Sequence, residues 1–252
     1  MYCPECGTKN KNTAKVCVKC KTKFKDSNVN LVKKQISRKR IVILSLKRIL
    51  RSLDKSKGLE PKNTYAWSQK ADILRVLGRY GEAVEASNKA IKSDPKNSYA
   101  WVSNSFALKS LGHYKEALKA SKEAIKLDPE NLHAWISKGD AFSALKRYTN
   151  ALEAYDKSIK LDPKNPEAWY GKGTALHSLK RYKEAENAYE KTIKLYPVNA
   201  DAWVWKGITL CFLSHYKKAL EALDKAMELN PTLERDKSLK EWRVLLKAKL
   251  KK

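Results

Sequence analysis

The sequence predicts an all-α solenoid of stacked helical hairpins, and two observations lead to that prediction. Tryptophan recurs at a step of 34 residues, at Trp67, Trp101, Trp135, Trp169 and Trp203. Proline, asparagine and alanine recur at the same step, in series that begin at Pro61, Asn63 and Ala83. Four series in one register indicate repeated supersecondary units, each of which buries its apolar face against the next unit.

Each unit contains the pattern of two amphipathic helices. In the unit 132–165, leucine and aromatic residues recur at helical spacing through 132–145 and again through 152–159. Gly139 and Ala151 are small where the two helices should cross, which lets the backbones approach closely. The phrase LDPKN then ends the second helix, because proline lacks an amide donor and restricts the residue before it. We expect the asparagine of this phrase to cap the next helix.

This arrangement resembles the tetratricopeptide repeat (TPR) family. Each 34-residue unit has a bulky aromatic residue at its fourth place, a small residue at its eighth, alanine at its twentieth and proline near its end. The resemblance covers 64–233 as five units: 64–97, 98–131, 132–165, 166–199 and 200–233. It implies a basic linker and degenerate repeat helix over 26–63. An amphipathic C-terminal helix over 234–252 would cap the last unit, with Leu239, Trp242, Leu245, Leu246 and Leu250 on one face.

Four of the five cysteines lie in two CxxC turns, CPEC at 3–6 and CVKC at 17–20. Two such turns can direct four thiolates at one tetrahedral zinc ion, which then has no open position for catalysis. CPECG resembles the first knuckle of a zinc ribbon, although Val18 and Lys21 depart from that pattern in the second. We therefore expect one structural Zn²⁺ in residues 1–25, bound by Cys3, Cys6, Cys17 and Cys20. A redox dithiol pair or unliganded thiols are the alternatives.

Positive charge is concentrated near the N-terminus. The formal net charge is +26, and residues 1–63 hold 18 Lys/Arg against 4 Asp/Glu. This gradient favours an anionic partner there, with solubility as the alternative explanation. No apolar run approaches the length of a membrane span, and the N-terminus lacks the apolar region of a secretory signal. We expect a cytoplasmic protein, and a ribbon followed by TPR units resembles prokaryotic proteins.

The sequence does not support an enzyme. The four histidines do not cluster, and neither a glycine-rich phosphate loop nor a nucleophile elbow is present. Cys211 lies beside Phe212 and Leu213, which indicates a packed thiol. We therefore expect a protein without catalytic residues and without a small-molecule substrate.

The TPR resemblance also implies a concave groove lined by the first helix of each unit. The family's groove places correspond in this chain to a mixed, aromatic lining rather than to the lysine and asparagine clamp that holds acidic C-termini. Such a lining could anchor a peptide or a helix, although some of these residues could instead pack against the next unit, with Trp205 under the C-terminal helix. The expected partner-binding residues are Tyr65, Gln69, Tyr99, Ser103, Phe106, Lys109, Asp140, Tyr170 and Trp205.

Two functions from different classes follow. The first is a non-enzymatic adaptor or scaffold that binds a protein or peptide segment in the TPR groove and uses the zinc ribbon as a second docking module. The second is a nucleic-acid-associated factor that contacts phosphates through the basic ribbon and a helix over 33–57. A weaker third possibility is an anionic membrane surface bound by the basic amphipathic segment 36–53.

Overall fold

The computed structural model describes residues 41–53 and 63–250, and within these ranges it is helical apart from turns and connecting segments. The predicted zinc ribbon and most of the predicted linker therefore lie outside the described residues. Contacts divide the chain into two compact units, 1–45 and 46–252. Of the first unit only 41–45 is described, as part of a helix over 41–53. The second unit contains the repeats.

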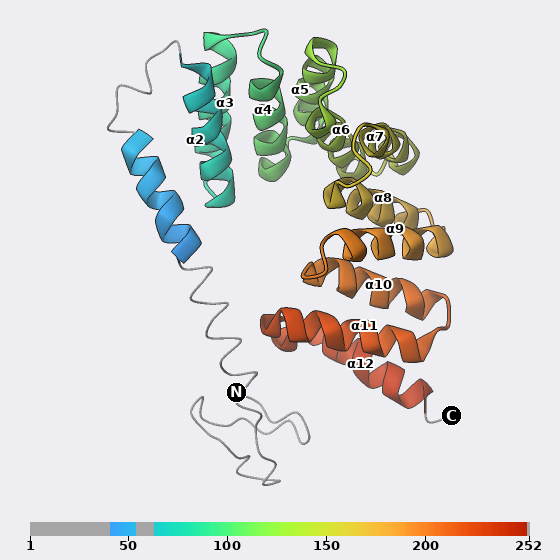
Figure 1. Ribbon diagram of the computed structural model, residues 1–252. Helices are drawn as coiled ribbons and strands as arrows, with labels where there is room; N and C mark the ends of the chain where they lie inside the picture. The colour runs from blue at the N-terminus through green and yellow to red at the C-terminus, as the bar shows by residue number, and fades with distance from the viewer. Residues whose placement is uncertain (1–40, 54–62, 251–252) are drawn as a thin grey trace. The chain divides into compact units, whose positions relative to one another are not determined.

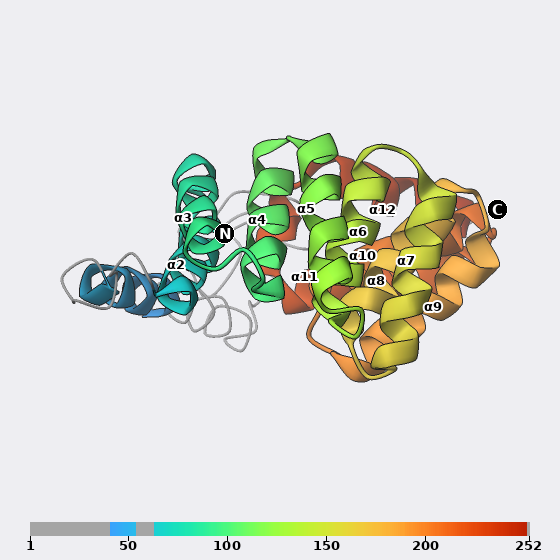
Figure 2. The same cartoon turned by 90° about the horizontal axis from the view of Figure 1, so that it is seen from above.

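Five helical hairpins follow one another through the described part of the second unit (Figure 1). Each helix packs against the helix that follows it in the chain, and each hairpin lies beside the next (Figure 2). The helices are α2 (Thr64–Val76), α3 (Tyr80–Ser93), α4 (Ser98–Leu111), α5 (Tyr114–Leu127), α6 (Leu132–Ala144), α7 (Tyr148–Leu161), α8 (Pro166–Ser178), α9 (Tyr182–Leu195), α10 (Ala200–Phe212) and α11 (Tyr216–Leu229). The predicted all-α array of hairpins is confirmed.

The repeated DPxN-type phrase forms the joint between hairpins. Asn131 is the N-cap of α6, and its side chain accepts a hydrogen bond from the Ala134 amide, as predicted. The Trp135 indole Nε1–H donates to the Pro129 carbonyl at 2.8 Å, six residues back. The same indole-to-proline bond recurs in the next two joints, at 2.9 and 3.0 Å. The tryptophan thus satisfies a carbonyl of the turn that connects one hairpin to the next.

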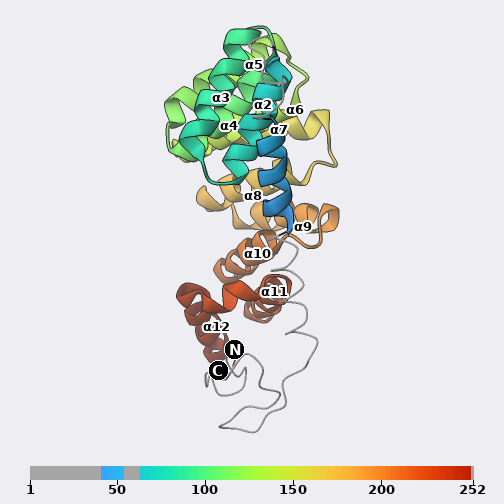
Figure 3. The ribbon, with the colours of Figure 1, turned by 90° about the vertical axis from the view of Figure 1, so that its left-hand side faces the viewer.

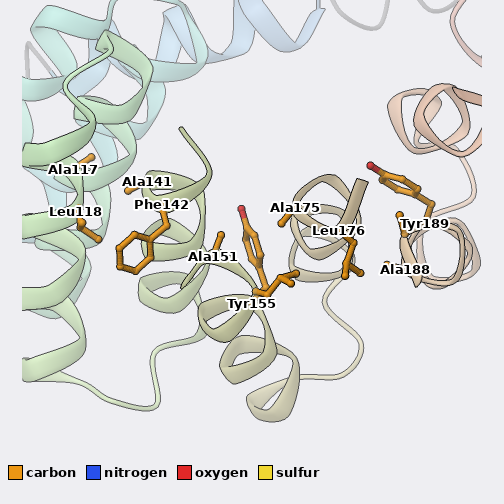
Figure 4. Packing of buried hydrophobic residues seen from close by; sticks show 12 residues of the cluster. Ala117, Leu118, Ala141, Phe142, Ala151, Tyr155, Ala175, Leu176, Ala188 and Tyr189 are labelled. Carbon is orange, nitrogen blue, oxygen red and sulfur yellow. The ribbon is translucent and has the colours of Figure 1, made fainter. Parts of the chain in front are cut away.

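Glycine at the eighth place of a unit makes room for a bulky residue of the second helix. A Cβ built on Gly139 would lie 2.7 Å from Tyr155 Cε1, and one on Gly171 would overlap the same ring. Tyr155 therefore lies in a notch between α6 and α8 and is only 1% exposed (Figure 4). In the next hairpin Gly173 makes the same room for Tyr189. The space at Gly139 is therefore filled by this ring.

The ends of the array are covered by additional helical segments. Leu50, in the helix over 41–53, is buried in a cluster with Ala71 and Leu74 of α2. At the other end, η2 (Pro231–Arg235) leads into α12 (Lys237–Lys249), which lies beside α11 (Figure 3). Leu239 and Leu246 are buried against α10 and α11.

The buried face of α12 is narrower than the sequence predicted. Leu245 and Leu250 were expected on this face, but they are 51% and 46% exposed. Leu245 directly precedes Leu246 and so points to another side of the helix, and Leu250 is the C-cap, beyond the last helical residue. Because α12 packs chiefly against α11 and η2, it buries a single narrow stripe. No helix in the described ranges is long and apolar enough to cross a membrane.

Candidate functional site

The predicted partner-binding residues lie on the first helices of the hairpins. Neighbouring first helices contact one another along the array, from α2 to α10. We call their shared surface the first-helix face. Tyr65 and Tyr99 are its most exposed aromatic side chains among the predicted residues, at 61% and 38%. Gln69, Phe106, Lys109, Asp140, Tyr170 and Trp205 are half-buried, whereas Ser103 is buried.

At the N-terminal end of this face, two tyrosines lie beside one carboxylate. The Tyr99 hydroxyl donates to Asp72 Oδ2 at 2.5 Å, and Ser103 Oγ lies 3.4 Å from the same oxygen. The Tyr65 and Tyr99 rings lie 6.4 Å apart. Burial and the bond to Asp72 raise the pKa of Tyr99, so its hydroxyl stays a donor. The bond joins α2 to α4 and fixes the Tyr99 ring beside the exposed Tyr65.

In the middle of the face, a lysine and a carboxylate join the second and third hairpins. Lys109 Nζ lies 2.5 Å from Asp140 Oδ2, and the Tyr155 hydroxyl donates to the other carboxylate oxygen at 2.8 Å. The Phe106 ring lies under two cations, with Arg75 at 5.5 Å and Lys109 at 5.8 Å. Both carboxylate oxygens of Asp140 are therefore occupied, and the charge of Lys109 is balanced by Asp140 rather than left free for a ligand.

At the C-terminal end, aromatic side chains surround His177. Its ring lies 5.2 to 5.4 Å from the rings of Tyr182, Trp205 and Phe212, and its Nδ1 is 3.0 Å from the Thr209 hydroxyl. Burial lowers the pKa of His177. The imidazole is therefore held in its neutral form inside an aromatic cluster, where it packs rather than titrates near neutral pH.

Tyr170 and Trp205 lie in the same part of the face. Burial and the nearby charge of Asp201 raise the pKa of Tyr170 to about 12, while a hydrogen bond with Trp205 opposes the shift. Trp205 packs against the cluster that contains Leu176 and Tyr189. It therefore packs towards the preceding hairpin, and α12 instead approaches Phe212 through Trp242, at 6.2 Å.

Three members of the aromatic cluster, His177, Tyr182 and Phe212, were absent from the predicted partner-binding residues. Tyr182 begins a second helix and stacks on Phe212 with ring centroids 4.7 Å apart. The sequence could have indicated Tyr182, because a tyrosine begins the second helix of each of the five hairpins and recurs at the same 34-residue step. The predicted metal ligands Cys3, Cys6, Cys17 and Cys20 lie outside the described residues.

Comparisons with known sequences agree with this geometry. Models described as tetratricopeptide repeat or TPR repeat match 64–97, 99–131, 139–180, 166–199 and 188–221. These segments together cover more than half of the chain. No curated protein matches the chain in sequence.

Solved structures of other proteins share the fold. TTC0263, a thermophilic TPR protein of Thermus thermophilus, is 20% identical with a TM-score of 0.62, over 74% of this chain and 98% of that one. YrrB, described as a TPR protein with an unusual peptide-binding site, is 23% identical with a TM-score of 0.52, over 75% and 95%. MamA of Desulfovibrio magneticus is 21% identical with a TM-score of 0.56, over 67% and 96%.

The repeat register, the helical hairpins and the sequence models all lead to one assignment. The chain belongs to the tetratricopeptide repeat family.

Proposed function

We propose that the protein is a non-enzymatic adaptor that binds a protein or peptide segment on its first-helix face. The observation that carries the proposal is the pair Tyr65 and Tyr99, which stays exposed while Asp72 holds Tyr99 in place. Aromatic side chains with fixed orientation contribute most to binding energy in protein interfaces, because little conformational entropy is lost. The description of YrrB as peptide-binding supports the same class of ligand for this chain.

The test is affinity capture from the native cell lysate with the full-length protein, after nuclease treatment. A specific protein should be retained by the parent and lost by the double variant Tyr65→Ala with Tyr99→Ala. The matched control is Tyr196→Ala, because Tyr196 is 50% exposed but follows α9, away from the first helices. Capture that survives the double variant, or that fails equally in the control, would contradict the proposal.

We further propose that residues 1–25 form a zinc-bound docking module. The support is the donor set alone, since four cysteine thiolates in two CxxC turns match the ligands of structural zinc. The parent should then carry about one zinc per chain by mass spectrometry of the metal content, and Cys17→Ser should lower that content. Equal zinc in the Cys211→Ser control and in Cys17→Ser would argue against the module.

The nucleic-acid alternative rests on the 18 Lys/Arg against 4 Asp/Glu of residues 1–63. If it holds, log K should fall with log salt at a slope of about −0.9 for each duplex phosphate that is neutralised. The same capture experiment separates the two functions, because material that disappears with nuclease favours the alternative.

A further inference from the structure

At four of the five places where a second helix packs against the helix that follows its hairpin, a polar pair joins the two helices. Asp156 of α7 pairs with Lys172 of α8 at 2.6 Å, and Glu190 of α9 pairs with Lys206 of α10 at 2.9 Å. At the C-terminal end Asp224 pairs with Arg243 of α12 at 2.6 Å. At the first interface the pair is neutral, with Asn104 Nδ2 donating to Asn88 Oδ1 at 2.8 Å. Three of these pairs join a carboxylate to a cation and are neutral overall, and the fourth joins two uncharged asparagines.

The interface between α5 and α6 is the exception. Lys122 stands where the other second helices carry an acidic or amide residue, and it faces Lys138 of α6. Neither lysine forms an ion pair with a described residue. Burial, and then the charge of Lys122, lower the pKa of Lys138, and the nearby Glu153 opposes the shift without an ion pair. The half-buried Lys138 ammonium therefore lies near a second, exposed ammonium group of like charge, and the two repel each other.

Two surface hollows share Lys122 in their lining, and together they form a trough lined by cations. One has a cavity volume of about 410 Å³ and is lined by Leu118 and Leu145 together with Lys115, Lys119, Lys122 and Arg147. The other has about 390 Å³ and includes Lys122, Lys138 and Lys157, with Glu153 as its acidic residue. We call the two hollows together the lysine trough. Six cations thus surround a largely apolar floor against a single carboxylate.

We propose that the lysine trough is a second binding site, separate from the first-helix face, for an acidic peptide segment whose carboxylates alternate with leucine or phenylalanine side chains. The floor of Leu118 and Leu145 suits the apolar side chains, and the surrounding ammonium groups suit the carboxylates. An acidic residue beside Lys122 would supply the counter-charge that the neighbouring interfaces obtain from their own chain.

The chemistry of the trough favours this occupant over others. The aromatic rings of the trough are already engaged by its cations, because Lys138 Nζ lies 4.7 Å from the Trp135 ring and the Arg147 guanidinium lies 4.8 Å from the Phe142 ring. Bases of single-stranded nucleic acid would therefore compete with these cations for the rings on which they stack. A second copy of this chain is a poor match, because the chain has 53 Lys/Arg against 27 Asp/Glu.

The decisive variant is Lys122→Glu in the full-length protein. Glutamate at this place reproduces the Glu190–Lys206 pair of a later interface, so the variant should be at least as stable as the parent by thermal unfolding. The probe is a fluorescent synthetic peptide in which glutamate pairs alternate with leucine and phenylalanine. Its affinity, measured by anisotropy, should fall about tenfold or more. Loss of binding with retained stability cannot be explained by unfolding.

The matched control is Lys191→Glu, which makes the same charge change on an exposed residue of α9. This control should bind the peptide like the parent. The proposal is overturned if both variants weaken binding equally, or if Lys122→Glu leaves the affinity unchanged. It is also overturned if an all-glutamate peptide or oligothymidylate binds as tightly as the probe, since the trough would then be a non-specific cationic surface. Tyr65→Ala with Tyr99→Ala should not affect probe binding, which separates this site from the adaptor face.

Discussion

Single residues at the eighth and sixth places of the units decide how closely the hairpins pack. Gly139 and Gly171 leave the space that the Tyr155 ring fills, and the Tyr155 hydroxyl then reaches Asp140 on the first-helix face. The sequence predicted small residues at Gly139 and Ala151. It did not reveal which side chain fills the notch, because Tyr155 and Gly171 belong to different units and meet only after stacking.

At this notch we expect Gly171→Ala to destabilise the protein. Alanine in a helix is ordinarily favoured over glycine, but its Cβ would overlap the Tyr155 ring, and overpacking typically costs about 1–3 kcal/mol. Urea unfolding measures the change. Gly81→Ala is the control, since nothing lies within 4 Å of its Cβ and it should be neutral or stabilising. Equal effects of the two substitutions would show that helix propensity alone decides the outcome.

His177 should make the free energy of unfolding fall as the pH is lowered below neutral. Burial lowers its pKa below the ordinary 6.5, so the unfolded chain binds the proton more tightly. Its contribution is complete above that ordinary value and is lost as pH falls through the lower folded pKa. Thermal unfolding between neutral and mildly acidic pH should show a smaller decline in His177→Gln than in the parent. The exposed His133→Gln should keep the parent's decline, and identical pH profiles of all three proteins would contradict the assignment.

At the scale of the helix, the array is defined by its caps. Asparagine precedes each first helix of the five hairpins and accepts a hydrogen bond from a first-turn amide. This feature could be predicted, because capping depends on neighbours within three residues. The Tyr99–Asp72 bond and the proximity of Lys122 to Lys138 could not be predicted, because each involves two different helices and depends on how adjacent hairpins are rotated.

Asn131→Ala tests the cap. The variant loses the bond to the Ala134 amide and the donation from Asn131 Nδ2 to Ser98 Oγ at 3.1 Å. We expect the free energy of unfolding to fall by about 0.5–2 kcal/mol. Asn187→Ala in the middle of α9 is exposed and should be neutral or slightly stabilising, since alanine is the better helix former. If Asn131→Ala were as stable as Asn187→Ala, the Asn131 cap would not contribute to the stability of the protein.

At the scale of the whole molecule, each hairpin depends on its neighbours rather than on a central core. The buried residues form several clusters along the array, and the cluster at α10 and α11 is completed by Leu239 and Leu246 of α12. Stability of such arrays is approximately a sum of local and nearest-neighbour contributions. The 34-residue step predicted this organisation, whereas the narrow buried face of α12 became evident only from its packing.

Local dependence predicts a local response to Leu246→Ala. Leu246 is 1% exposed, so the truncation should cost about 2–5 kcal/mol. Hydrogen exchange should accelerate in α10 to α12 and stay unchanged in α2 to α5. Leu245→Ala, one residue away and 51% exposed, should have little effect. Uniform acceleration along the array would show a single cooperative unit instead.

The indole-to-proline bond at each joint has an implication for the history of the chain. Because that bond spans only six residues, a whole unit could be duplicated or deleted without disturbing either of the joints that flank it. The number of hairpins is therefore free to change by recombination at the gene level. A copying event that included the second and third units would also copy the interface where Lys122 meets Lys138. The same event would then lengthen the protein and double its cationic trough.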